Sequence, residues 1–388
     1  MKIKRNLALI SFACCMFFLS RVVVAESIEN IQIISCTSSD CDLQITWHAV
    51  ESNRDWDVKV SKLSYLGPTL PVINVETDSG DESLLPDIQN CYYTGTQNSS
   101  NATTVFVKYC DGDAGFTGFV SSDDGIYGIN GTTMTLLETG NTGGTADDTG
   151  SGDNGKRTKG ASNSDPYLQP RNMDSSLLPS LEFVIEPSYI TSVGGQDSAI
   201  DRIMENLALT NMMYERYGIN LISLKAILIL DKDITTSDSQ GNILNEVEKL
   251  RKQNIQQYSG DVTMFLTGKE FSQPYLWGWS ESGYACALQQ AVDLDTNLNT
   301  HTIGKSAGVM RDLPTLMQRG WILAHEVGHS LGAGHWVNDA LMDGGFQPDK
   351  TLEDYSNTVH RCDVLRSMLK TCAYDPKNKK FTDFYECL

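Results

Sequence analysis

The sequence predicts a chain of α+β or α/β class in two parts, a β-rich region followed by a mostly parallel sheet covered by helices. Three observations support this prediction. Short runs of β-forming residues, separated by turn residues, fill residues 26–138. A segment rich in Gly, Ser, Thr, Asp and Asn then begins at residue 139. From residue 176 onward, strand-like and helix-like patterns alternate, which is typical of a parallel sheet with helices on its faces.

Residues 1–25 have the pattern of a secretion signal. Basic residues at positions 2, 4 and 5 precede an apolar run over residues 7–19, and small residues end at Ala25. A membrane anchor is the alternative, but the run is short for a span of about 20 residues and Arg21 interrupts it. We therefore expect a secreted, extracellular protein with no membrane span in the mature chain.

Charge and cysteine content narrow the possible partners and the compartment. The 388-residue chain has a formal net charge of −19, which argues against nucleic acid as a partner. An even number of cysteines follows the signal, and this predicts disulfides in a secreted chain. They fall in two groups of four on either side of a long gap, so we expect pairing within each group, although a cysteine metal site is an alternative. These cysteines are Cys36, Cys41, Cys91, Cys110, Cys286, Cys362, Cys372 and Cys387.

In the β-rich region, residues 26–138, the clearest strands are 43–47 and 104–108. Asn98, Asn101 and Asn130 each begin an N-x-[ST] sequon. Three sequons in one small region of a secreted chain predict a glycoprotein, where the host glycosylates.

Residues 139–175 are predicted to be a flexible linker, because the segment has too few apolar residues, almost none up to residue 165, to order itself. The dibasic pair Lys156-Arg157 lies within it. Cleavage after Arg157 would separate the two parts of the chain, so we predict a processing site there.

Alternating elements follow in the second part, residues 176–388. Apolar runs predict strands at 181–185, 221–230 and 262–266. Amphipathic patterns predict a helix that starts at Asp197 or Ser198 and ends at Gly218, and a second helix over 243–255. The predicted strands and helices therefore alternate along the chain.

The segment 321–342 carries three of the chain's six histidines. His325 and His329 are four residues apart, so on a helix they lie on one face. Gly332 permits the positive φ that ends a helix, and the turn brings His335 towards the same point. Three neutral imidazoles leave the fourth position of a tetrahedral zinc open to water, as a catalytic zinc site requires.

Glu326 follows the first of these histidines. Zinc lowers the pKa of a bound water towards about 7, and a neighbouring carboxylate can then take a proton from it. The histidine pattern therefore predicts a hydrolytic metal site with Glu326 as its general base.

The pattern H-E-x-x-H-x-x-G-x-x-H, followed by Met342, resembles the metzincin zinc metalloproteases. Two further stretches resemble the reprolysin (adamalysin, or ADAM-type) family: D-V-T-M-F-L-T-G at 261–268, and G-x-x-x-x-G-x-x-C at 278–286. The motif C-Y-Y-x-G at 91–95, with Cys110 beyond it, is similar to the propeptide of that family. Trp336 stands where reprolysins usually have Asp, so the subfamily stays open.

This resemblance implies a fold. Residues 176–388 would form a metzincin domain, with a mostly parallel five-stranded twisted sheet, an antiparallel edge strand, an active-site helix and a Met-turn. Residues 26–138 would form a β-rich prodomain with a Cys91–Cys110 disulfide, so the protein would be made as a zymogen.

The resemblance also implies an activity. A secreted zinc endopeptidase would act on protein or peptide substrates, holding one catalytic zinc ion at His325, His329 and His335 with Glu326 as general base. Its peptide substrate would pair antiparallel with residues 279–282. We expect a monomer.

Two alternatives stay open. The first is a catalytically silent secreted binding protein on the same fold, in which the metal is structural. The second concerns calcium as a further cofactor: Glu182 and Asp261 match positions that hold calcium in some relatives, or they are two surface carboxylates.

Overall fold

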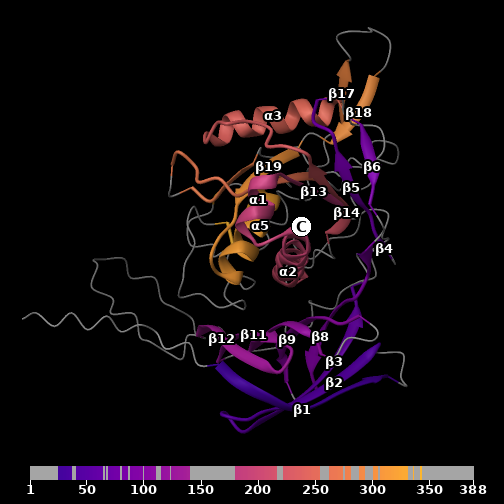
Figure 1. Ribbon diagram of the computed structural model, residues 1–388, viewed down its shortest axis with the longest axis vertical. Helices are drawn as coiled ribbons and strands as arrows, with labels where there is room; N and C mark the ends of the chain where they lie inside the picture. The colour runs from indigo at the N-terminus through magenta and orange to yellow at the C-terminus, as the bar shows by residue number, and fades with distance from the viewer. Residues whose placement is uncertain are drawn as a thin grey trace, which may run out of the picture.

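A computed structural model describes residues 25–139 and 180–342 of the chain, apart from short gaps within these ranges. Residues 1–24 of the predicted signal, the processing site at Lys156-Arg157 and residues 343–388 lie outside the described residues, as does most of the predicted linker. Figure 1 shows a β-barrel at one end of the molecule and a sheet flanked by helices at the other. No helix among the described residues has both the length and the apolar character needed to cross a membrane.

The N-terminal region forms a closed eight-stranded barrel, and side chains along its strands point alternately into and out of it, as the burial of residues 43–49 shows. Trp47 and Trp56 are cross-strand partners that stack inside it, with ring centroids 5.5 Å apart. Tyr93 belongs to this interior cluster, whereas its neighbour Tyr92 belongs to the core of the second part. In order around the barrel, the strands are β1 (Ala25–Ser35), β12 (Thr133–Thr139), β11 (Gly125–Asn130), β10 (Thr117–Ser122), β9 (Ser100–Lys108), β8 (Tyr92–Gln97), β3 (Arg54–Lys62) and β2 (Leu43–Ala49).

A mixed seven-stranded sheet forms the centre of the second part. Five neighbouring strands run parallel, and the strand at each edge is antiparallel. The second part of the chain supplies five of these seven strands, the number predicted for it, and the N-terminal region supplies the other two. In order, the strands are β16 (Gly278–Ser280), β19 (Ser306–Arg311), β15 (Val262–Thr267), β13 (Ser180–Ile185), β14 (Ser223–Leu230), β5 (Val72–Val75) and β6 (Glu82–Leu84).

The two added strands, β5 and β6, lie within residues 26–138, which were predicted to form a separate prodomain. The run at 72–75 is short and, apart from Asn74, apolar, so it can be buried on both faces beside β14. The boundary between the two parts at residues 138 and 139 stays a prediction. Two short ribbons complete the strands: β4 (Thr69–Leu70) with β7 (Ile88–Gln89), and β17 (Leu288–Val292) with β18 (Thr300–Gly304).

Helices cover both faces of the sheet, as predicted from the alternating pattern (Figure 1). One face carries α1 (Pro187–Ser192), α2 (Gln196–Glu215) and α5 (Leu316–Ser330), and the other carries α3 (Gln240–Gln253). Alternate residues of β13 follow this division, since Phe183 packs with the α2 face and Val184 with the α3 face.

Disulfides form within the N-terminal group of cysteines. Cys91 pairs with Cys110, which confirms the pairing that the family resemblance implied, and Cys36 pairs with Cys41. The four C-terminal cysteines lie outside the described residues. Two of the predicted glycosylation sites, Asn98 and Asn130, are exposed on the barrel.

Candidate metal centre

Helix α5 positions two of the three predicted metal ligands. Its start is fixed by a reciprocal cap, in which the Gln318 backbone N–H donates to Thr315 Oγ1 (3.2 Å) and the Thr315 N–H donates to Gln318 Oε1 (3.3 Å). The helix continues to Ser330, so His325 and His329 lie one turn apart on one face. His325 is 4% exposed and His329 is half-buried.

The structure brings the third histidine to the same point. The Nε2 atom of His335 lies 3.3 Å from that of His325 and 3.1 Å from that of His329, and the latter two are 3.0 Å apart. A tetrahedral zinc with nitrogen ligands at about 2.0–2.1 Å holds such ligands roughly 3.3 Å apart, so the three residues fit this ion. The turn predicted at Gly332 lies outside the described residues, as does Trp336.

His325 is held as a neutral imidazole in one tautomer. Its Nδ1–H donates to the Leu341 carbonyl oxygen at 2.8 Å, which leaves the lone pair of Nε2 directed at the other two rings. Burial, with His329 as a further cause, lowers the pKa of His325 to about 3. A neutral ring is the form that binds a metal ion.

Met342 lies against the same helix. It is fully buried, and a Cβ added at Gly328 would lie 2.6 Å from its sulfur atom. A side chain larger than hydrogen at residue 328 would therefore have to displace the Met342 side chain.

Glu326 lies against the edge strand β16. Ser280 Oγ is 2.7 Å from Glu326 Oε2 and 2.9 Å from the Glu326 carbonyl oxygen. A Cβ at Gly278 would lie 2.6 Å from Oε1, so glycine permits this close contact. Burial raises the pKa of Glu326 to about 8, against the opposing effect of the Ser280 hydrogen bond. A cation held by the three histidines would favour the charged carboxylate and oppose the shift.

Sequence reasoning missed the roles of Gly278 and Ser280. Ser280 lay within the predicted substrate-pairing residues 279–282, but neither residue was predicted to contact Glu326. The available signal was the pair of small residues at alternate positions of a strand, which leaves one face open to an approaching side chain.

The family follows from comparison with known proteins. Residues 180–374, half of the chain, match the family model Reprolysin_5, which is described as metallo-peptidase family M12. The chain belongs to the M12 metallopeptidase family. This family is typically zinc-dependent, in agreement with the group of three histidines in this metallopeptidase. The narrower ADAM-type assignment stays a prediction.

Other comparisons add little. The M12 metallopeptidase overlays on the crystal structure of metalloproteinase-II from Bacteroides fragilis with a TM-score of 0.41 and 13% identity, over 82% of this chain and 88% of that chain. A chaperone–substrate complex gives a TM-score of 0.32 and 10% identity, over 83% of this chain and 53% of that chain. Scores this low carry no functional conclusion. No curated protein matches this chain by sequence.

The calcium prediction gains no support from the described residues. Glu182 is buried in the sheet at 3% exposure rather than on the surface, and its carboxylate accepts a hydrogen bond from Thr263 Oγ1 at 2.6 Å. Asp261 lies outside the described residues.

Proposed function

We propose that this M12 metallopeptidase is a zinc-dependent endopeptidase, secreted and made as a precursor that is cleaved after Arg157. The observation that carries the catalytic part is the convergence of three imidazole nitrogens within 3.3 Å of one another. The secretion signal and the processing site rest on the sequence patterns at residues 1–25 and 139–175.

His325, His329 and His335 would hold the zinc ion. When bound, such an ion supplies Lewis acidity, lowering the pKa of a water and polarising a carbonyl group. The Leu341 carbonyl fixes the tautomer of His325, and burial keeps that ring neutral and ready to bind.

Glu326 would act as general base, taking a proton from the attacking water and passing it to the leaving amine. Ser280 orients the carboxylate for this transfer, because its hydroxyl contacts one carboxylate oxygen at 2.7 Å. Gly278 allows the strand to approach closely enough for this contact.

The peptide substrate would add to β16, the edge strand that contacts Glu326. An extended peptide gains main-chain hydrogen bonds when it pairs with the free side of such a strand. Trp279 of β16 is 48% exposed and offers an apolar surface to a substrate side chain. Trp277 instead packs edge-on against Trp321 of α5, with centroids 6.2 Å apart.

The test is hydrolysis of quenched fluorescent peptides by secreted, processed protein, whose mature N-terminus is read by mass spectrometry. We expect a chelator to abolish activity and one equivalent of zinc to restore it. Glu326→Gln should keep the zinc and lose activity by about 10²–10⁴-fold, the usual contribution of a general base.

The exposed Glu29 of the barrel offers a matched control, because Glu29→Gln makes the same change away from the site. Activity that survives complete removal of zinc, or a fully active Glu326→Gln, would contradict the proposed chemistry. An inactive native protein with stoichiometric zinc would favour the silent binding protein.

A further inference from the structure

The N-terminal region is joined to the peptidase part by two separate surfaces. The first is strand addition: β5 pairs parallel with β14, from Val72 opposite Ile227 to Val75 opposite Leu230. Backbone hydrogen bonds extend beyond this ladder, including that from the Asp231 N–H to the Val75 carbonyl oxygen at 3.1 Å. Main-chain pairing of this kind is independent of side-chain identity and is hard to replace by water when the strand is buried.

Both faces of β5 are buried by the peptidase part. Val72 belongs to the core on the α2 face, whereas Ile73 and Val75 belong to the core on the α3 face with Leu244 and Val247. The three β5 side chains are 0–1% exposed. Loss of β5 would therefore expose the apolar residues beneath it and leave β14 as an open edge strand, an arrangement prone to aggregation.

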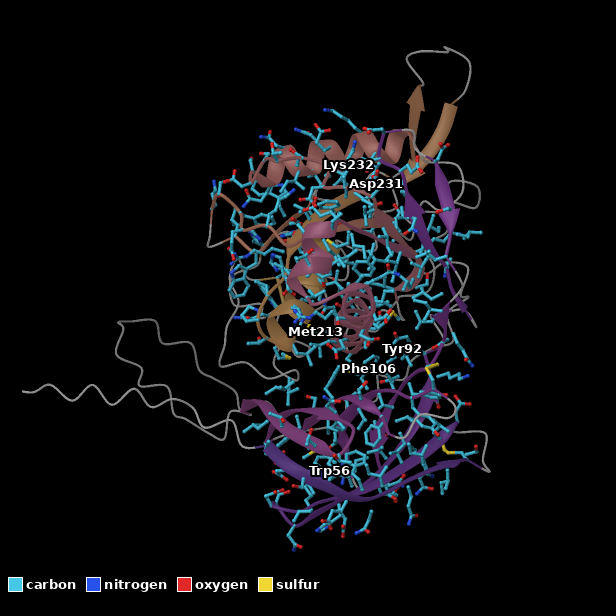
Figure 2. All side chains as sticks on the ribbon, in the orientation of Figure 1. Trp56, Tyr92, Phe106, Met213, Asp231 and Lys232 are labelled. Atoms are coloured by element: carbon cyan, nitrogen blue, oxygen red, sulfur yellow. A yellow bond between two sulfur atoms is a disulfide. The ribbon has the colours of Figure 1, made fainter. Side chains whose placement is uncertain are left out.

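The second surface lies between the barrel and α2. The outward side chains Tyr92, Phe106 and Phe119 stack in a row, with ring centroids 6.1 and 5.4 Å apart, and belong to the same core cluster as Met213 of α2. Figure 2 shows Tyr92 and Phe106 between the barrel and Met213, and Trp56 inside the barrel.

A polar contact completes this second surface. Asp201 of α2 accepts hydrogen bonds from Lys108 Nζ at 2.8 and 2.9 Å and from the Tyr92 hydroxyl at 2.9 Å. Lys108 and Asp201 are each about one third exposed, so solvent screens the pair only in part.

Strand β5 lies far from β16, the edge strand proposed to bind the substrate. Four strands separate β5 from β16, so five strand spacings of about 4.8 Å place the two edges roughly 24 Å apart. Retaining β5 is therefore compatible with a peptide bound on β16.

We propose that residues 25–139 remain bound to the peptidase part after the chain is cleaved within 140–179, as a non-covalent subunit that completes its sheet. The two disulfides among the described residues lie within the N-terminal region, so the two surfaces above supply the attachment. The partner that fits the open edge of β14 is thus this chain's own N-terminal region. The inference rests on the proposed processing of the chain, but it concerns assembly and does not depend on the proposed peptidase activity.

The experiment uses the full chain with a recognition sequence for a site-specific protease inserted after Arg157. We expect both fragments of the cut protein to elute together in equal amounts on native gel filtration and to separate only in denaturant. An N-terminal fragment that elutes alone, with the remainder folded and monodisperse, would overturn the proposal. Because the readout is co-elution, it is independent of peptide hydrolysis.

Variants in each of the two surfaces test whether that surface holds the N-terminal fragment on the peptidase part. Asp201→Ala should raise the dissociation constant of the cut complex by roughly tenfold, since it removes one partner of a hydrogen-bonded charge pair. Asp197→Ala, at an exposed residue one turn earlier on α2, should leave it unchanged.

Ile73→Asp places a charge in the β5 interface and should release the N-terminal fragment, whereas Ile34→Asp, at a 52% exposed barrel residue, should not. If Ile73→Asp fails to fold, the Asp201 pair still decides the question. Cut complexes of Asp201→Ala and Ile73→Asp as tight as the native one would overturn the assignment.

Discussion

At the scale of single residues, the candidate site depends on groups that orient other groups. The Leu341 carbonyl fixes the tautomer of His325, and Ser280 contacts the Glu326 carboxylate. Each contact fixes the orientation of a side chain in advance, so this rotational freedom does not have to be lost when metal or substrate binds. The consequence is that a side chain without direct substrate contact can alter the rate.

Ser280→Ala tests this positioning role. We expect kcat to fall on the order of tenfold, the size of one hydrogen bond to a charged group, with little change in KM and full zinc content. Ser280→Thr keeps the hydroxyl and should recover most of the rate. Ser52→Ala, at an exposed turn of the barrel, is the matched control. If Ser280→Ala instead loses activity because part of the protein unfolds at the assay temperature, its thermal midpoint will be lower. That result, with no rescue by Ser280→Thr, would indicate a purely structural role.

At the scale of elements, α5 is placed by close contact with α2. A Cβ added at Gly320 would lie 2.3 Å from Leu209 Cδ2 and 2.8 Å from Leu209 Cβ, so the two helices approach more closely than an alanine would allow. The Tyr214 hydroxyl of α2 also donates to the Ala324 carbonyl of α5. These contacts hold the helix that carries His325.

Gly320→Ala should therefore destabilise the protein although alanine is the better helix former. Overpacking costs about 1–3 kcal/mol, against a helix-propensity gain of about 1 kcal/mol, so we expect a lower thermal midpoint. Gly241→Ala is the matched control, because that glycine lies in α3 with no atom within 4 Å of its added Cβ. It should leave the midpoint unchanged or raise it. Equal midpoints for the two variants would contradict the inferred contact.

At the scale of the whole molecule, the three histidines bring together helix α5 and the segment that follows it in the chain. Two lie on α5, and His335 lies beyond its end, near the buried pair Leu341 and Met342 in sequence. A metal ion bound by all three would tie the helix to the segment that follows it. Such an ion binds the folded state and stabilises it by mass action.

Removal of zinc should therefore lower the thermal midpoint of the native protein. Ligand present at about 1,000 times its dissociation constant stabilises a folded protein by about 4 kcal/mol, so the loss should be easily measured by calorimetry. In His329→Ala, which lacks one ligand, the chelator should have little effect. A native midpoint that does not change after complete removal of zinc would argue that the site does not link these segments.

The sequence alone predicted the elements whose signals are local. The spacing of His325, His329 and His335 indicated the metal group, and apolar runs located β13, β14 and β15 to within two residues at each end. The Cys91–Cys110 disulfide came from the family resemblance. These predictions succeed because ligand spacing on a helix and burial of a strand leave periodic patterns in the sequence.

Only the tertiary structure decided which distant segments meet. Nothing in the run at 72–75 shows that it joins β14, about 150 residues later, because main-chain pairing leaves no mark of its partner in the side chains. The contact between Ser280 and Glu326 likewise depends on how β16 packs against α5. The sequence by itself determined the chemistry that the metal group can offer, and the packing of the chain decided which residues orient it and what completes the sheet around it.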